Sequence, residues 1–256
     1  MKNHNVLWDS KLNPKIIVVM PAYNAEKTVS KTYQDLPKDL IREVILVDDA
    51  SRDETIKEAK NLGITVYIHK VNRGYGANQK TCYGQALKRN PDIVVMVHPD
   101  YQYDVTLVGV LCEPIVNGRA DIMLGSRIQT RHQVLSGGMP LWKYFANRFL
   151  TLVENLSMGL NLSEYHTGFR AYSAEVLKSI PYYKFSDDFV FDQQILISAL
   201  ANKFNISEIP VPCKYFPEAS SINFKRSVKY GLMTLWTLFT YYIFQSGLVK
   251  IGIFKK

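Results

Sequence analysis

The chain has 256 residues, enough to bury a sizeable core in one large domain or in one domain with an appendage. Its net charge of +8 favours an anionic partner, such as a phosphorylated substrate or an anionic lipid. The basic residues form no long run, except loosely near the C-terminus, so we expect no nucleic-acid-binding arm and no nucleic acid as the partner. Three distant cysteines, Cys82, Cys112 and Cys213, are typical of reduced thiols in a cytosolic protein, not of a disulfide framework.

Strand and helix patterns alternate through the first half of the chain. The sequence Ser51-Arg52-Asp53-Glu54 is predicted to begin the second helix as a capping box. Such alternation predicts right-handed βαβ units and an α/β fold with a mostly parallel sheet. Strands are predicted over residues 15–21, 43–47, 64–69 and 92–97, and helices over 25–36, 51–63 and 72–89.

Polar side chains follow three of these strands where the strands end, in Tyr23-Asn24, Asp48-Asp49 and Asp100-Tyr101-Gln102. The carboxyl ends of parallel strands share one edge of a sheet, where ligands bind. One carboxylate there can accept a hydrogen bond from a base or ribose, and another can hold Mg²⁺ or Mn²⁺ on a diphosphate. We therefore expect a nucleotide site. The alternative for Asp48-Asp49 is a loop start whose charges complement a helix dipole.

Gly74-Tyr75-Gly76 precedes the third predicted helix. It lacks the third glycine of the dinucleotide-binding fingerprint and follows the third strand rather than the first. A Rossmann oxidoreductase therefore remains only an alternative. We expect a helix N-terminus that faces the nucleotide or packs tightly on the sheet.

The second half of the chain is less regular. A polar, glycine-containing segment over residues 129–138 is expected to be a mobile loop over the site. The remaining predicted elements are a strand over 120–126 before Arg127, a helix over 141–156 that carries Arg148, an amphipathic helix over 189–204 with Asp192 in its first turn, and an edge-like strand over 206–211.

The C-terminal segment has the length of a membrane helix but not its pattern. Residues 230–249 contain no charged residue, which is long enough to span a bilayer. Trp236 and Tyr242, however, lie in the middle, whereas spanning helices collect aromatic residues at their ends. We interpret residues 225–256 as a membrane-associated helical segment after a domain over 1–224, drawn to anionic lipid at the interface. A spanning helix and a helix buried in a homo-oligomer are the alternatives. A polar stripe is formed by Ser227, Tyr230, Thr234, Thr237, Tyr241 and Gln245, and the flanking basic residues are Lys225, Arg226, Lys229, Lys250, Lys255 and Lys256.

Taken together, these motifs resemble a family 2 glycosyltransferase of the GT-A fold. The chain is most similar to the branch of dolichyl-phosphate mannose synthases and polyprenyl-phosphate glycosyltransferases. The resemblance spans about residues 15 to 225, and as a set the motifs are specific. They are Pro21-Ala22-Tyr23-Asn24, Asp48-Asp49-Ala50-Ser51, Asn72-Arg73-Gly74 with Gly76-Ala77, Asp100-Tyr101-Gln102, Gly125-Ser126-Arg127 and Thr167-Gly168-Phe169-Arg170.

The resemblance implies a UDP- or GDP-linked sugar donor bound at the strand ends, with Mg²⁺ or Mn²⁺ on its diphosphate. The implied donor-binding residues are Pro21, Ala22, Tyr23, Asn24, Asp48, Asp49, Gly74 and Asp100. The implied metal ligands are Asp100, Gln102 and His98. The acceptor phosphate is assigned to Arg127, Arg148, Arg170 and Arg226, and catalysis to Asp100, Asp192, Arg127 and Arg170.

The chain departs from the family pattern at two places. The family usually reads Asp-x-Asp-x-Gln at the metal loop, and here His98 replaces the first aspartate. Imidazole binds Mn²⁺ more readily than Mg²⁺. Many relatives carry an acidic pair where this chain reads Asp192-Gln193-Gln194, with a single carboxylate.

The charged residues of the candidate site help to distinguish a hydroxyl acceptor from a phosphate acceptor. A hydroxyl acceptor needs a base to take its proton, whereas a phosphate monoester, with a second pKa of about 6, is already anionic at pH 7 and needs cations to hold it. The chain offers several arginines and only Asp192 as an obvious base. We therefore predict inverting transfer of a hexose to a polyprenyl phosphate at the cytoplasmic face of a membrane. The alternatives are transfer to a sugar hydroxyl in polysaccharide or glycolipid synthesis, and an inactive nucleotide-binding homologue, which His98 suggests.

Overall fold

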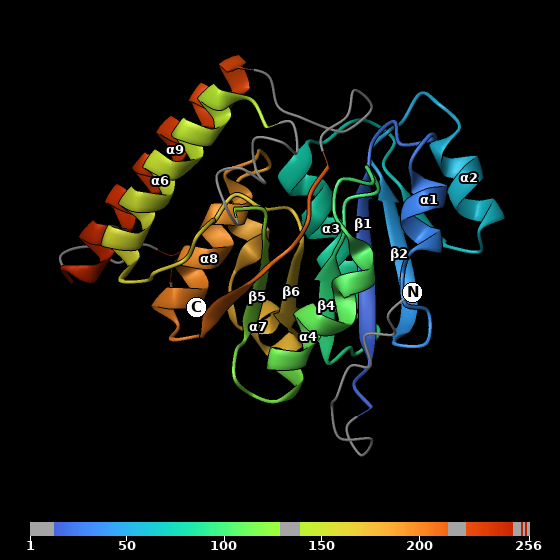
Figure 1. Cartoon of the computed structure of the whole chain (residues 1–256), viewed down its shortest axis with the longest axis horizontal. Coiled ribbons are helices and arrows are strands. Elements are labelled where there is room, and N and C mark those ends of the chain that lie inside the picture. The colour runs from blue at the N-terminus through green and yellow to red at the C-terminus, as the bar shows by residue number, and fades with distance from the viewer. Residues whose placement is uncertain (1–12, 129–138, 215–223, 248–251, 253, 255–256) are drawn as a thin grey trace.

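A seven-stranded sheet in the order β3-β2-β1-β4-β6-β5-β7 forms the centre of this computed structural model (Figure 1). The structure describes residues 13–128, 139–214, 224–247, 252 and 254. Strand β6 runs antiparallel to both of its neighbours, and every other pairing is parallel. The strands are β1 (Ile16–Ala22), β2 (Ile41–Asp48), β3 (Thr65–Ile68), β4 (Ile93–Met96), β5 (Ile122–Ser126), β6 (Arg170–Ser173) and β7 (Ile206–Pro210).

Helices cover both faces of the sheet, which is why the central strands β1 and β4 are apolar at every position. On one face, α3 (Tyr75–Leu87) and α8 (Phe191–Ala201) pack on Ile17, Val19 and Val94. On the other face, α1 (Val29–Gln34), α2 (Thr55–Asn61) and α4 (Val108–Val116) pack on the intervening residues. The short α7 (Ala174–Ser179) and two 3₁₀ turns, Val105–Leu107 and Tyr182–Lys184, complete this part.

The predicted strands and the mostly parallel α/β sheet are confirmed, and β7 lies at an edge. Strand β6 and helix α4 were not predicted; β6 is four residues long, reads Arg-Ala-Tyr-Ser and has no apolar run. The capping box is wrong: α2 begins after Glu54 without a side-chain cap, because the Ser51 hydroxyl accepts a hydrogen bond from the Asn24 amide instead. The loop predicted over residues 129–138 lies outside the described residues.

The amphipathic pattern predicted around α8 is also wrong. Almost every side chain from Phe191 to Ala199 is buried, because the sheet covers one side of the helix and α9 (Phe224–Gln245) packs against another. Helix α9 also lies beside α6 (Leu141–Met158) at one end of the sheet (Figure 1).

The polar stripe predicted on α9 faces the protein, since Thr234, Thr237 and Tyr241 are buried. Phe254 packs against Tyr241 and completes this end of the core. Leu238 is buried beside this stripe, whereas Val228, Leu232, Trp236, Phe239 and Tyr242 are exposed on the opposite side of the helix. None of the helices in the described parts of the chain is both long and apolar enough to cross a membrane.

Candidate active site

A cavity of about 850 Å³ follows the carboxyl ends of β1, β2 and β4 and continues between α6 and α9. The three polar clusters predicted at the strand ends converge here: Tyr23, Asn24, Asp49, Asp100 and Gln102 all line it. The structure therefore joins a polar site at the strand ends to a second region between two helices.

Asp49 is the most rigidly held acidic side chain at the strand ends. Its Oδ1 accepts a hydrogen bond from the Arg73 amide and its Oδ2 one from the Gly74 amide, both at 2.9 Å. Nδ1 of His69 lies 2.7 Å from Oδ1 of Asp49, and Nε2 of the same ring lies 2.9 Å from the Thr81 hydroxyl. The loop after β3 and the N-terminus of α3 thus fix the carboxylate. The sequence motifs did not single out His69.

The neighbouring Asp48 has a different place. Its side chain is fully buried outside the cavity lining, and Oδ2 accepts a hydrogen bond from the Ser51 amide. Asn24 also serves the local fold, since its Oδ1 accepts a hydrogen bond from the Arg52 amide while its backbone has a φ of 51°. Asp48 therefore shapes the turn after β2, and its position outside the cavity lining does not support its predicted role as a donor-binding residue.

Asp100 and His98 face the cavity just beyond β4. Oδ1 of Asp100 accepts a hydrogen bond from the Gln102 amide at 3.1 Å, and burial raises the pKa of this carboxyl to about 7. Burial also lowers the pKa of His98 to about 4, so its imidazole is neutral at pH 7. The carboxylate of Asp100 is thus held where its negative charge is poorly solvated, and a cation beside it would stabilise the charge.

These donors fit a metal that is shared with a substrate. Within the described ranges, no three His, Cys, Asp or Glu side chains gather as a metal cage. Mg²⁺ and related cations are commonly held by one or two protein groups plus phosphate oxygens and water. Asp100 and His98 would supply such a partial set, with Gln102 beside them.

Arg170 does not reach the cavity, which corrects the expectation that it binds the acceptor phosphate. Its side chain is completely buried, and Nε and Nη2 donate to the backbone carbonyls of Thr167 and Tyr165. Nη2 lies 3.4 Å from Oδ2 of Asp192. A guanidinium cannot lose its proton in a protein, so it needs this buried counter-charge.

Asp192 does line the cavity, but its carboxylate is already occupied. Oδ2 accepts a hydrogen bond from Tyr75 at 2.8 Å and Oδ1 accepts one from Gln79 at 3.0 Å. With Arg170 also beside it, the Asp192 carboxylate is an organising group of the site, and the geometry gives no support to a role as a free base.

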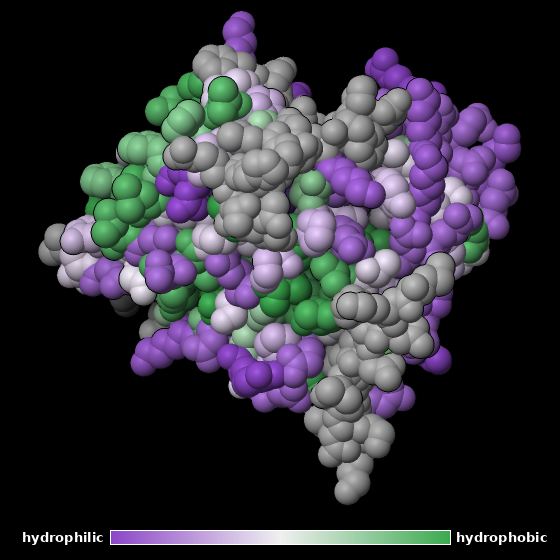
Figure 2. Space-filling model, in the orientation of Figure 1, coloured by the Kyte–Doolittle hydropathy of each residue, from purple (hydrophilic) through white to green (hydrophobic). Residues whose placement is uncertain are grey.

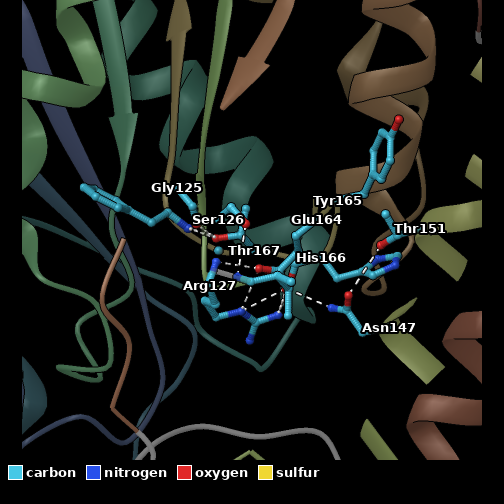
Figure 3. Close-up of polar contacts among 12 residues, drawn as sticks. Gly125, Ser126, Arg127, Asn147, Thr151, Glu164, Tyr165, His166 and Thr167 are labelled. Atoms are coloured by element: carbon cyan, nitrogen blue, oxygen red, sulfur yellow. Dashed lines mark hydrogen bonds and ion pairs between the residues drawn. The ribbon is translucent and has the colours of Figure 1, made fainter. Parts of the chain in front are cut away.

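Arg127 is fixed at the cavity wall by Glu164, a residue that the sequence motifs missed (Figure 3). The Arg127 amide and Nε donate to Glu164 at 2.8 and 3.0 Å, and Nη2 donates to Glu164 and to the His166 carbonyl. Asn147 of α6 donates to the same carboxylate at 2.9 Å. Glu164 is the only acidic residue between Asn155 and Ala174, a signal that could have indicated a buried charge pair.

The two remaining predicted arginines, Arg148 and Arg226, differ in their position relative to the cavity. Nη1 of Arg148 donates to the Ser163 carbonyl and the residue does not line the cavity, so its position does not support the predicted contact with the acceptor phosphate. Arg226 of α9 does line it, together with Lys143 and Lys229, which were not predicted as site residues. Burial lowers the pKa of Lys143, and the nearby positive charge of Arg127 lowers it further. Nζ of Lys229 is paired at 2.6 Å with Asp188, which also lines the cavity, so the region between α6 and α9 keeps an excess of positive charge from Arg226 and Lys143 that suits an anion.

The comparisons with known proteins agree with this geometry. Glycosyl transferase family 2 matches residues 17–180. The chain is 30% identical over 215 residues to an uncharacterized protein of Methanocaldococcus jannaschii, covering 84% of this chain and 88% of that protein. It is 28% identical to the UDP-N-acetylglucosamine–dolichyl-phosphate N-acetylglucosaminyltransferase of Methanococcus voltae, covering 78% of this chain and 86% of that enzyme.

Among solved structures, the chain resembles glucosyl-3-phosphoglycerate synthase of Mycobacterium tuberculosis in complex with Mn²⁺ and UDP-glucose. The TM-score is 0.71 at 20% identity, covering 93% of this chain and 84% of that chain. At this identity the likeness concerns the fold, and the predicted GT-A fold is confirmed. The family match and the named relative identify the chain as a glycosyltransferase. The chain belongs to glycosyl transferase family 2.

Proposed function

We propose that this glycosyltransferase moves a hexose, with inversion, from a nucleotide sugar to a polyprenyl phosphate. The observation that carries the proposal is the single cavity that contains Asp49 and Asp100 at one end and Arg127 and Arg226 at the other. The strand-end part suits a nucleoside diphosphate, and the cationic part suits a second phosphate. The Methanococcus voltae relative is named for transfer to dolichyl phosphate, which supports a lipid phosphate as the acceptor.

In this proposal each end of the cavity has its own task. Pro21 to Asn24, Asp49 and Gly74 surround the base and ribose, while Asp100, His98 and Gln102 hold Mg²⁺ or Mn²⁺. The metal would supply positive charge to the leaving diphosphate. Arg127, Arg226, Lys143 and Lys229 orient the acceptor phosphate for attack on the far side of the sugar. An anionic phosphate oxygen needs no base, which agrees with the hydrogen-bonded state of Asp192.

The first experiment screens UDP- and GDP-linked hexoses with a polyprenyl phosphate in the presence of Mg²⁺ or Mn²⁺. We expect metal-dependent formation of a lipid-linked sugar that mild acid releases, because a sugar phosphodiester is acid-labile. An acid-stable product on a saccharide acceptor would instead favour transfer to a hydroxyl. Nucleotide binding without turnover of any donor would favour an inactive homologue.

We further propose that an apolar face on α6 and α9 rests on the cytoplasmic surface of a membrane. Large side chains project into solvent at helical spacing on both helices, and Figure 2 shows hydrophobic atoms gathered over this end of the molecule. On α6 they are Leu141, Phe145, Phe149, Leu152 and Leu156, and on α9 they are Val228, Leu232, Trp236, Phe239 and Tyr242.

The position of this α6–α9 face supports a lipid partner. The cavity continues between the same two helices, so a phosphate in it would lie close to the face. Lys225, Arg226 and Lys229 at the start of α9 would add attraction to anionic lipid. The division into a domain over 1–224 and a membrane-associated segment over 225–256 stays part of this proposal, with α6 of the first domain sharing the contact.

The α6–α9 face predicts anionic-lipid-dependent vesicle binding. Replacing both Leu152 and Phe239 with glutamate should weaken binding at least about tenfold, because an apolar side chain contributes about 1.5–3 kcal/mol when buried. The measurement is co-sedimentation with zwitterionic vesicles and with vesicles that contain added anionic phospholipid. Val71→Glu, an exposed apolar residue after β3, is the matched control and should bind as wild type does. Equal binding by all three proteins would exclude this face.

A further inference from the structure

At the metal end of the cavity, four side chains from separate segments of the chain form a continuous chain of contacts, and three of them line the cavity. They are Arg170 on β6, Asp192 on α8, Tyr75 on α3 and His98 after β4. Arg170 lies 3.4 Å from Asp192, the Tyr75 hydroxyl lies 2.8 Å from Asp192, and the same hydroxyl lies 3.2 Å from Nε2 of His98.

The direction of each hydrogen bond in this chain follows from chemistry. Arg170 can only donate, so it holds Asp192 as an ionised carboxylate that can only accept. Gln79 turns its amide nitrogen toward Asp192, because its oxygen accepts a hydrogen bond from Tyr83 at 2.9 Å. The single proton of the Tyr75 hydroxyl is therefore directed at Asp192.

This arrangement leaves His98 one way to contact Tyr75. The Tyr75 oxygen has given its proton to the Asp192 bond, so it can only accept from the imidazole. The proton of His98 must then lie on Nε2, and the lone pair lies on Nδ1. None of the described side chains or backbone groups forms a hydrogen bond with Nδ1, although His98 lines the cavity.

Packing also fixes the orientation of the His98 ring. The ring stacks on Tyr75 with an interplanar angle of 15°. Its Cδ2–Nε2 edge abuts Gly168, where an added Cβ would lie 2.5 Å from Cδ2 and 2.8 Å from Nε2. The Gly168 amide is held in turn by the Tyr103 hydroxyl at 2.8 Å. The edge that carries Nδ1 therefore points away from this wall.

We propose that Tyr75 is a positioning residue that locks His98 in the Nε2–H tautomer, so that Nδ1 becomes a nitrogen ligand for the divalent metal beside Asp100. The inference rests on the metal-dependent function proposed above. Its consequence is metal selectivity: an imidazole nitrogen suits Mn²⁺, whereas Mg²⁺ prefers oxygen ligands. The outer contacts to Asp192 and Arg170 orient the ligand in the way that partners of metal-bound histidines generally do.

The tautomer can be read directly by ¹⁵N NMR of the histidine rings in the metal-free protein. We expect wild-type His98 to be protonated on Nε2, and Tyr75→Phe to give a mixture of tautomers. Tyr101→Phe is the matched control, since Tyr101 also donates to a carboxylate at 2.8 Å, on Asp35, but does not line the cavity. A wild-type ring protonated on Nδ1 would overturn the proposal, whether or not the enzyme turns over.

Metal selectivity is tested by electron paramagnetic resonance of Mn²⁺ with a nucleoside diphosphate, in competition with Mg²⁺. Tyr75→Phe should weaken Mn²⁺ binding by about 10–100-fold, the usual effect of losing such an outer contact, and change Mg²⁺ binding much less. His98→Asp should shift the preference toward Mg²⁺. If Tyr75→Phe does not fold, Gly168→Ala displaces the ring by pushing on its Cδ2–Nε2 edge, the edge that contacts Tyr75, and should lower the Mn²⁺ preference in the same way. An unchanged Mn²⁺-to-Mg²⁺ ratio in His98→Asp would overturn the ligand role of His98.

Discussion

Replacing Asp100 with asparagine is expected to lower turnover by at least about 10³-fold, which corresponds to about 4 kcal/mol of activation free energy. The substitution keeps the shape of the side chain and removes its negative charge. In our proposal that charge holds the metal on the leaving diphosphate, and a metal of this kind stabilises the transition state by several kcal/mol. Steady-state kinetics at saturating donor and metal measure the effect.

The same variant should fold normally. Asp100 lies beyond the end of β4, and burial disfavours its charged form, so its loss should change the free energy of unfolding by no more than about 1 kcal/mol. Asp104→Asn is the matched control in the same loop. It replaces the carboxylate that caps a 3₁₀ turn through Thr106 with an amide that caps about equally well, so both stability and turnover should be retained. Wild-type turnover in the Asp100 variant would disprove the metal assignment.

The second large effect is expected at Glu164. Glu164→Gln leaves the Arg127 guanidinium at the cavity wall without its counter-charge, and removing one partner of a buried pair costs about 3–5 kcal/mol. The loss should appear as a lower denaturation midpoint. The Michaelis constant for the acceptor should also rise, since Arg127 would no longer be held in place. Glu113→Gln breaks an exposed pair with Arg119 and should cost less than about 1 kcal/mol.

The pH dependence of stability should also reveal the ion pair between Glu164 and Arg127. Burial alone would raise the pKa of Glu164, but the Arg127 guanidinium outweighs burial and holds that pKa below its ordinary value of 4.5. A lowered pKa in the folded protein means that the pair stabilises the fold fully above about pH 4.5, and that this contribution is lost as the pH falls through the folded-state pKa. Glu164→Gln should therefore show a flatter loss of stability below pH 4.5 than the wild type. Parallel acid curves for the two proteins would mean that the charge pair contributes nothing.

Local pattern was sufficient for the alternating half of the fold and for the strand-end clusters. The β-branched runs before Ala22, Asp48 and Val97 could only be strands buried on both faces, and parallel pairing brings their carboxyl ends together. The polar residues that follow were therefore predictable as one site. Strand β6 was not predictable, because its burial comes from its neighbours β4 and β5 and not from its own composition.

The roles of the charged residues depended on contacts between distant segments. Arg127 and Arg170 both end glycine-containing motifs, and the family resemblance assigned both to the acceptor phosphate. In the folded chain, Arg127 lies at the cavity wall beside Glu164. Arg170 is buried in the core beside Asp192. Spacing along a chain predicts the face of a strand or helix on which a residue lies. Spacing does not predict which distant carboxylate will pair with a given guanidinium. A buried guanidinium is stable only where such a carboxylate lies beside it.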